Sequence, residues 1–398
     1  MNRNYTRRTL LKSLVGLPFG ALLAGLLPSP MSRAKAAMPN EVRIITPPRL
    51  DTAHLGQRIL CYRPMRQGSP NMSLEQTGKQ TIAHNYGHGG SGWTLAPGSV
   101  NYVIDLAEKS AQPLAIDKRE PIVVAGAGVM GLFTAYELVR RGYKNVTVIS
   151  ESFEGLTSHN AGGLLAPVSM DNEPKMQAVI DNIGIQAYQF YAAIANGQNS
   201  ELAGGTVIVP AYFENRSDSG LEPYVGIAMK PAKDVVLDFG NGTRRPMVAY
   251  DDGIFIDTAV LMDKLRAWLD LHVNFEQRKI KNFSDLRANL VFNCTGLGSS
   301  TLNDDSKLVS VQGHLVMLKD QEPKNLQSMI LIYLDKGKTH SGQNVKRSFY
   351  IFPKHLPGTG PNDVGVIGGT FIEGGTAKTP NIEEFDKMIA GAKHFYGI

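Results

Sequence analysis

Cysteine is nearly absent from this chain of 398 residues, which contains only Cys61 and Cys294. Two cysteines cannot build a disulfide scaffold, and a chain of this length can bury a stable core without one. No spacing of Cys and His residues is typical of a zinc site. In an exported protein the two thiols could be oxidised, but the sequence does not show whether their Cα atoms come within bridging distance.

Long hydrophobic runs are missing as well. The most apolar stretch, Ser13–Leu27, is short and interrupted by glycine and proline, so it does not predict a membrane-spanning helix. It follows a basic segment, Thr6–Lys12, and precedes the small residues Ala34-Lys35-Ala36. A basic segment, an apolar segment and a small-residue cleavage site in this order predict that residues 1–36 are an export signal.

The pair Arg7-Arg8, followed by x-Leu-Leu-Lys, resembles a bacterial twin-arginine signal. An ordinary secretory signal with a chance Arg-Arg pair is the alternative. We therefore expect the twin-arginine export machinery to be a partner, and the mature protein to be periplasmic or secreted from a bacterium.

Acidic residues are absent from the leader, and this explains the basic charge of the chain. The formal net charge is +5, and residues 1–36 hold six Lys or Arg residues, so the charge without them falls by six to −1. The high isoelectric point belongs to the leader and does not indicate nucleic-acid binding.

A strand–turn–helix–strand pattern at residues 121–151 organises the rest of the chain. An apolar strand leads into Gly126, Gly128 and Gly131, spaced G-x-G-x-x-G, and a second apolar strand ends on Glu151, 20 positions after the last glycine. This spacing predicts dinucleotide binding, with phosphates at the helix N-terminus and the acid on a ribose hydroxyl. The alternative is a glycine-rich turn in another α/β protein. A fingerprint of this kind often starts a domain, yet 120 residues precede it here.

Four predicted strands end in small-residue turns, after residues 84, 124, 293 and 367. In an open α/β sheet, ligands bind beyond the carboxyl ends of the strands, so the four turns are expected to line one extended ligand. The pattern also predicts a strand at 58–63 that stops at Pro64, and a polar loop at 335–346.

Several of these segments together resemble the D-amino-acid oxidase family of FAD enzymes, which includes D-aspartate oxidases. The matching pieces are Val123–Leu132, Thr157–Pro167, Asn293–Gly296, Gly368-Gly369 and, most specifically, Tyr62–Arg66 and His84–Gly92. The resemblance covers most of residues 58–398. It implies an α/β fold with a Rossmann-like FAD-binding domain and a mixed α+β substrate domain containing an antiparallel sheet.

The order of these segments differs from that of the family. There, the pieces matching 62–66 and 84–92 lie near the C-terminus; here they precede the fingerprint, which predicts a circular permutation with a new junction at 109–120. The rival interpretation makes residues 37–120 a separate domain. The expected layout is an export signal (1–36), a permuted segment completing both domains (37–120), the FAD-binding core (121–170), mainly substrate domain (171–288), an FAD-binding return strand (289–307), substrate domain (308–362), and an FAD-domain strand and terminal helix (363–398).

The resemblance also implies site residues. Arg63 is expected to grip a substrate carboxylate with its planar fork, Tyr350 to contribute its hydroxyl unless it is only a core aromatic, and Gly90 to offer its carbonyl to the amine. The implied cofactor-binding residues are Gly126, Ala127, Gly128, Val129, Met130, Gly131, Glu151, Ser152, Thr157, Ser158, Gly163, Leu164, Gly89, Gly92, Trp93, Thr94, Thr295 and Gly296.

Other residues are expected to play no catalytic or metal-binding part. The resemblance implies no essential acid or base, and His84 and His88 lie in a glycine-rich context that favours a structural role over metal binding. Where many family members carry a second tyrosine, this chain has Lys346. That lysine could favour acidic substrates or could point into solvent.

The function implied is oxidation of D-amino acids to imino acids, which hydrolyse to 2-oxo acids and ammonia while dioxygen is reduced to hydrogen peroxide. The partners would be the amino acid and dioxygen, with no nucleic acid, and a homodimer is left open. Two alternatives remain: an enzyme of the same fold with another amine substrate or electron acceptor, and a flavin- or nucleotide-binding protein without turnover.

Overall fold

The computed structural model describes residues 41–111, 116–355 and 358–398. The predicted export signal, its cleavage site and part of the predicted linker at 109–120 lie outside these residues. Within the described ranges, no helix combines the length and hydropathy needed to cross a bilayer.

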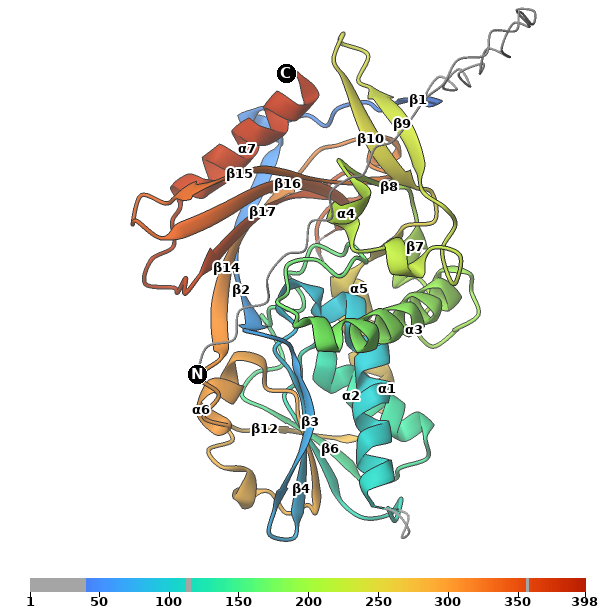
Figure 1. The fold of residues 1–398 in the computed structure, drawn as a ribbon, viewed down its shortest axis with the longest axis vertical. Coiled ribbons are helices and arrows are strands. Elements are labelled where there is room, and N and C mark those ends of the chain that lie inside the picture. The colour runs from blue at the N-terminus through green and yellow to red at the C-terminus, as the bar shows by residue number, and fades with distance from the viewer. Residues whose placement is uncertain (1–40, 112–115, 356–357) are drawn as a thin grey trace, which may run out of the picture. The chain divides into compact units, whose positions relative to one another are not determined.

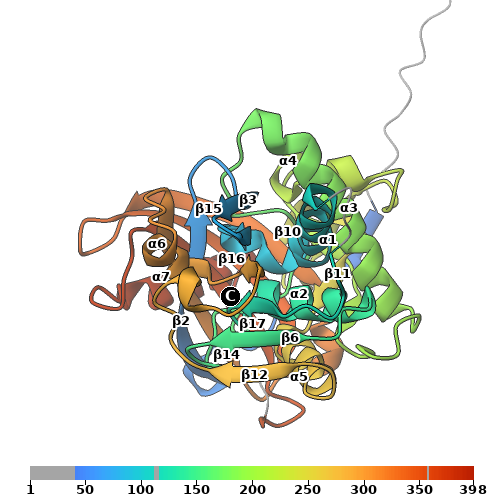
Figure 2. The ribbon, with the colours of Figure 1, turned by 90° about the horizontal axis from the view of Figure 1, so that it is seen from below.

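One sheet carries the dinucleotide fingerprint (Figure 1). Its order is β12 (Asn274–Gln277), β6 (Val146–Ser150), β5 (Ile122–Ala125), β13 (Leu290–Asn293), β4 (Gln80–Tyr86) and β3 (Asn71–Thr77). All neighbours pair in parallel except β3, which is antiparallel to β4. Seen from below, β12 lies beside β6 at the edge (Figure 2). This is the Rossmann-like part of the predicted α/β fold, which is confirmed.

Both faces of this sheet are buried, which explains its nearly continuous apolar strands. Along β5, Ile122 and Val124 join the cluster that includes the helices α1 (Gly92–Ser110), α2 (Val129–Arg140), α3 (Gln177–Ala195) and α5 (Thr258–Leu269). Val123 and Ala125 alternate to the opposite face and contact a smaller cluster around Phe283. The strand therefore has no polar face.

A second, mostly antiparallel sheet makes up the substrate domain. Its order is β1 (Glu41–Ile44), β9 (Lys233–Asp238), β10 (Arg244–Tyr250), β8 (Ala211–Phe213), β15 (Met329–Lys338), β16 (Asn344–His355), β17 (Val364–Glu373), β14 (Leu308–Leu318) and β2 (Leu55–Arg66). The helix α7 (Glu383–Tyr396) packs along β16, β17 and β14 (Figure 1). β7 (Thr206–Ile208) and β11 (Ile254–Ile256) form a separate two-stranded ribbon, and α4 (Arg216–Ser219) and α6 (Ser299–Leu302) are short helices.

Local signals explain how two of the helices begin and end. The carboxylate of Asp257 accepts a hydrogen bond from the backbone N–H of Val260 at 3.3 Å and caps α5, a role for which aspartate is well suited. Acidic residues occupy the first turn of α7 and basic residues its last turn, which complements the helix dipole. The helix ends at Gly397, whose φ of 71° is the left-handed conformation that favours glycine.

Two local predictions were wrong for reasons that involve neighbouring strands. Pro64 does not end its strand, because β2 is an edge strand that continues to Arg66 and has one neighbouring strand in its sheet, β14. The predicted polar loop at 335–346 is mostly a hairpin, in which Lys336 pairs with Lys346 and only residues 339–343 connect the strands. The exposed faces of this hairpin explain its polar sequence.

Of the four small-residue strand ends that we expected to line one ligand, three lie in one sheet. β4, β5 and β13 are parallel neighbours, so their carboxyl ends meet at one edge. The strand through residue 367 is instead part of β17, which continues to Glu373 between β16 and β14. Residues 363–398, expected to complete the FAD domain, thus lie in the other sheet together with α7.

Candidate functional site

A cavity of about 590 Å³ lies where residues of the two sheets meet. It is lined by the ends of β4, β5 and β13, the loop at 156–164, and side chains of β2, β15, β16 and β17. Most predicted site residues line it: Arg63, Tyr350, Gly90, Gly89, Gly92, Trp93, Gly126, Ala127, Gly128, Val129, Met130, Thr157, Ser158, Gly163, Leu164, Thr295 and Gly296.

The turn between β5 and α2 is shaped by its glycines. Gly126 has a φ of +105°, and a Cβ there would lie 2.5 Å from the carbonyl oxygen of Cys294. A Cβ on Gly131 would overlap the carbonyl oxygen of Gly126, so this glycine allows helix and strand to approach closely. The backbone N–H of Val129, in the first turn of α2, donates to the Ser158 hydroxyl at 3.0 Å. The turn therefore presents backbone to the cavity.

The loop that follows β4 forms another part of the wall. Gly87 and Gly89 have φ values of 90° and 57°, and the backbone N–H of Gly90 donates to the Ser169 carbonyl at 2.7 Å. The chain then enters α1 at Gly92. The loop and the helix therefore bring backbone atoms of small residues to the cavity.

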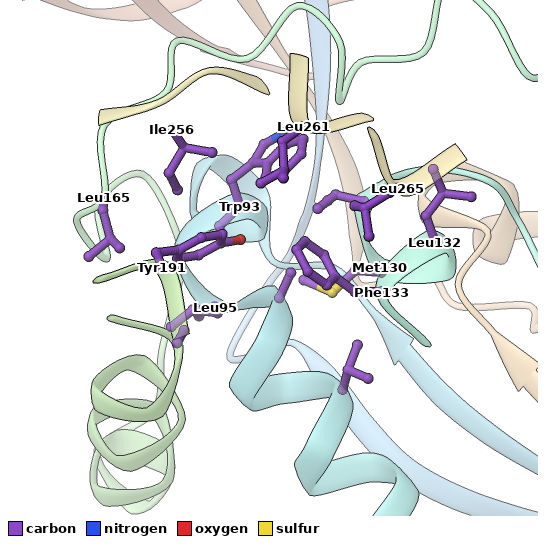
Figure 3. Packing of buried hydrophobic residues seen from close by; sticks show 14 of the residues in the cluster. Trp93, Leu95, Met130, Leu132, Phe133, Leu165, Tyr191, Ile256, Leu261 and Leu265 are labelled. Atoms are coloured by element: carbon purple, nitrogen blue, oxygen red, sulfur yellow. The ribbon is translucent and has the colours of Figure 1, made fainter. Parts of the chain in front are cut away.

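Trp93, in the first turn of α1, anchors this wall in the core (Figure 3). Its ring packs edge-on against Phe133 of α2, with centroids 6.2 Å apart, and its carbonyl accepts from the Tyr191 hydroxyl at 2.7 Å. Its indole N–H donates to the Ser158 carbonyl at 2.9 Å. Trp93 thus holds the loop around Ser158 in place besides lining the cavity.

Both histidines of this region have structural partners. Nε2 of His84 lies 3.1 Å from Glu75 and its Nδ1 lies 3.1 Å from Asn293. His88 Nε2 lies 3.0 Å from the Ser99 hydroxyl, and burial lowers the pKa of His88 to about 3. His88 is therefore neutral at ordinary pH. In the part of the chain that the structure describes, no group of three His, Cys, Asp or Glu side chains could hold a metal ion.

Arg63 brings a positive charge to the cavity without a carboxylate partner. Its Nη1 donates to the Thr370 carbonyl at 2.9 Å, and among residues 41–111, 116–355 and 358–398 no acid forms an ion pair with it (within 4.0 Å). Arg residues at such positions are usually paired or hydrated. The guanidinium therefore retains donors for an anion.

Tyr350 lies beside Arg63 in the cavity wall. Its ring stacks on Phe352, with centroids 4.5 Å apart and planes 6° from parallel. Its other face meets Gly368 and Gly369, where a Cβ would collide with the ring. Burial raises the pKa of Tyr350, and the positive charge of Arg63 opposes that shift. The phenol thus stays protonated, and it can donate a hydrogen bond.

Four predicted residues lie outside the lining of the cavity. Thr94 is buried and donates to the Ala166 carbonyl at 2.9 Å, and Gly131 sits behind Gly126. Glu151 is largely exposed and pairs with Lys279 at 3.3 Å, while the Ser152 hydroxyl donates to the Glu154 carbonyl. The cofactor roles of these four residues stay predictions, and Ser150 lines the cavity near the end of β6.

Sequence reasoning missed Lys354, which anchors the loop that lines the cavity. Its buried ammonium donates to the Thr258 hydroxyl at 2.5 Å and to the His159 carbonyl at 3.1 Å. Burial lowers the pKa of Lys354 to about 8. No spacing signal marks it, because a strand lysine is usually exposed.

The question whether the two cysteines pair is answered by the structure. Cys61 and Cys294 are both free thiols and both buried. Burial raises the pKa of Cys294 to about 12, so its thiol is neutral and inert at ordinary pH.

The family of FAD-dependent oxidoreductases described as DAO matches residues 121–397. The chain belongs to this family. Among curated relatives, it is 26% identical over 218 residues to a D-amino-acid oxidase of Dictyostelium discoideum, covering 52% of this chain and 59% of the relative. It is 27% identical over 213 residues to the D-aspartate oxidase of Homo sapiens, covering 50% of this chain and 59% of the relative. The chain thus spans little more than half the length of these relatives.

Solved structures of glycine oxidases are also similar to this member of the family. The glycine oxidase of Geobacillus kaustophilus has a TM-score of 0.48 and 16% sequence identity, covering 69% of this chain and 80% of that structure. The glycine oxidase of Bacillus cereus has a TM-score of 0.46 at 16% identity, covering 68% and 77%.

The cavity fits the cofactor of the family. Glycines of the β5–α2 turn let its backbone pack closely against Cys294 and the start of α2, and the N-terminus of α2, which lines the cavity, can receive phosphate. Asn85, which lines the cavity, has a buried Nδ2 without a hydrogen-bond partner in the described part of the chain. A buried donor without a partner costs free energy unless a ligand accepts its hydrogen bond, so this amide is available to a bound cofactor.

Proposed function

We propose that this protein is an exported flavoenzyme that oxidises D-amino acids to imino acids, which hydrolyse to 2-oxo acids and ammonia. The observation that carries the proposal is the guanidinium of Arg63, held in the cavity by the Thr370 carbonyl and paired with no carboxylate of the described residues. A planar fork of donors in a partly desolvated cavity is suited to a carboxylate.

The other residues of the site complete the grip on an amino acid. The Tyr350 hydroxyl, kept protonated by burial, would donate to the same carboxylate as Arg63. The carbonyl of Gly90 would accept from the substrate amine. Binding at three points fixes which face of the α-carbon meets the cofactor, and so distinguishes D from L substrates.

The cofactor would lie along the glycine-rich turns. Residues 126–130, together with the loop at 157–164 and the Asn85 amide, would hold it. Bound FAD would supply the oxidation itself, accepting a hydride from the substrate and passing electrons to dioxygen. No Asp or Glu of the described residues lines the cavity, so the residues present bind and orient the substrate and exclude water.

The first experiment asks whether the protein binds flavin and releases hydrogen peroxide. Purified protein, with and without added FAD, is examined by absorbance, and peroxide is then measured with a panel of D- and L-amino acids. Turnover of D-amino acids without turnover of L-amino acids supports the proposal. Turnover of another amine, or electron transfer only to an artificial acceptor, favours the alternative flavoenzyme; bound flavin without turnover favours a binding protein.

Arg63→Ala tests the carboxylate grip directly. Loss of two charged hydrogen bonds should lower kcat/KM by about 100-fold or more while FAD stays bound. Arg58→Ala is the matched control, because Arg58 lies on the same strand, is 45% exposed and pairs with Asp386. Full activity of Arg63→Ala would contradict the assignment.

We also propose that the chain is a circular permutation of the family fold. The support is that the segment before the fingerprint contributes to both sheets: β2 pairs with β14, and β4 pairs with β13. A rearranged gene that places residues 41–111 after residue 398 through a short linker should yield protein with the same flavin spectrum. An unfolded product would count against this origin.

Export by the twin-arginine route is a separate proposal, supported by Arg7-Arg8 and the leader in which they lie. Replacing both arginines with lysine should retain the protein in the cytoplasm of a bacterial host. Unchanged export in a host without the twin-arginine translocase would refute it.

A further inference from the structure

The cavity presents only positive formal charges. Arg63, Lys346 and Arg347 line it, and none of its described lining residues is Asp or Glu. Arg347 is already neutralised, because its Nε and Nη2 pair with Glu384 at 2.6 and 2.8 Å and its Nη1 pairs with Asp335 at 2.8 Å. Two cations, Arg63 and Lys346, therefore remain for a ligand.

Lys346 lines the cavity and forms no ion pair with a carboxylate of the described residues. Its ammonium lies over the ring of Phe371, 5.2 Å from the centroid, a contact that orients a cation without neutralising it. Asp171 and Glu373 line an adjoining recess that Lys346 also lines. Neither the Asp171 nor the Glu373 carboxylate forms an ion pair, within 4.0 Å, with another described residue. Asp171 instead accepts a hydrogen bond from the Gly68 N–H.

The opposing strand adds to this positive potential. Lys336 of β15 lies directly opposite Lys346 of β16. Like charges facing each other across a sheet are destabilising. An anion bound at Lys346 would relieve this repulsion.

The two free cations contact neighbouring residues of β17. Arg63 donates to the Thr370 carbonyl, and Lys346 lies over the ring of the next residue, Phe371. Both cations line the same cavity, so an amino acid whose α-carboxylate meets Arg63 would lie in a cavity that also presents Lys346.

We propose that the substrate carries a second anionic group, so that acidic D-amino acids such as D-aspartate and D-glutamate are preferred, with Lys346 as the residue that recognises the side-chain carboxylate. This inference rests on the proposed function. Under this proposal Lys346, which stands where many family members carry a tyrosine, determines substrate specificity.

The experiment compares each acid with its nearly isosteric amide. We expect kcat/KM for D-aspartate and D-glutamate to exceed that for D-asparagine and D-glutamine by about tenfold or more, because the acids alone pair with the ammonium. Lys346→Met should remove most of this ratio, and Lys346→Glu should invert it. The preference should weaken as salt is added.

Lys79→Met is the matched control, because it removes one exposed positive charge in the β3–β4 turn, outside the cavity. It should leave the acid-to-amide ratio unchanged. Equal kcat/KM for acids and amides, or a ratio that Lys346→Met does not alter, would overturn the inference while leaving D-amino-acid oxidation intact.

A binding measurement separates this inference from the proposed function. D-aspartate and D-asparagine are titrated into the protein, and intrinsic fluorescence is recorded. If no D-amino acid is turned over, the proposed function fails. Tighter binding of D-aspartate that depends on Lys346 would still support the acidic preference of the site, and equal binding would overturn it.

Discussion

Replacing Lys354 by methionine tests two effects of this lysine. Its buried ammonium is expected to lower the free energy of unfolding, and its hydrogen bonds are expected to hold the loop at 157–164. The lysine side chain is fully buried, and its ammonium donates to the Thr258 hydroxyl and the His159 carbonyl. Burial disfavours the charged form, which lowers the pKa of Lys354 from an ordinary 10.5 to about 8.

The direction of the pH effect follows from proton linkage. Between pH 8 and 10.5 the unfolded chain holds a proton on Lys354 that the folded chain has released. Stability should therefore rise with pH across this window. At about 1.4 kcal/mol per pKa unit, the gain between pH 7 and pH 9.5 is about 2 kcal/mol.

The assay is urea unfolding of the parent protein and of Lys354→Met at both pH values. Methionine approximates the volume of the lysine stem, and the other titrating groups cancel between the two proteins. The parent should gain about 2 kcal/mol relative to the variant. Lys346→Met, which removes an exposed lysine from the same strand, should show no such difference.

The same variant should bind FAD more weakly, because the loop that Lys354 anchors lines the cavity. We expect about tenfold weaker binding, the value of one charge-assisted hydrogen bond. A parent and variant with the same pH dependence would refute the linkage argument, and unchanged FAD affinity would refute the role in anchoring the loop.

Three further predictions concern local features of the chain. Gly131→Ala should abolish flavin binding and lower the free energy of unfolding by more than about 2 kcal/mol, because its Cβ meets backbone; flavin absorbance checks the first effect, and a normal spectrum would contradict it. Asp257→Ala should cost about 1 kcal/mol in urea unfolding through loss of the α5 cap, whereas the exposed Asp270→Ala should cost less. Because Cys61 and Cys294 are free, a reductant should leave the melting temperature unchanged, and a clear decrease would indicate a disulfide.

Features that depend on neighbours in sequence were predictable. The fingerprint strands, the Asp257 cap and the helix at 383–396 follow from spacing, turn residues and periodicity within short segments. The glycine positions of the cofactor cradle were predictable for the same reason, since a turn needs particular residues wherever it occurs.

Features that depend on distant segments were decided only by the tertiary structure. Pro64 is tolerated because its strand is at a sheet edge, and β17 lies in the second sheet because β14 and β16 lie on its two sides. Lys354 is buried because the loop at His159 and the start of α5 close over it.

Which charged side chains pair with one another was likewise not predictable from the sequence. Spacing alone does not show that Glu151 pairs with Lys279, that Arg347 is neutralised by Glu384, or that Arg63 and Lys346 form no ion pair with an acid of the described residues. Hydrogen bonds and ion pairs depend on distances between segments far apart in the chain. The sequence therefore determined that this protein has a dinucleotide-binding turn, whereas the fold decided which cations face the cavity beside it.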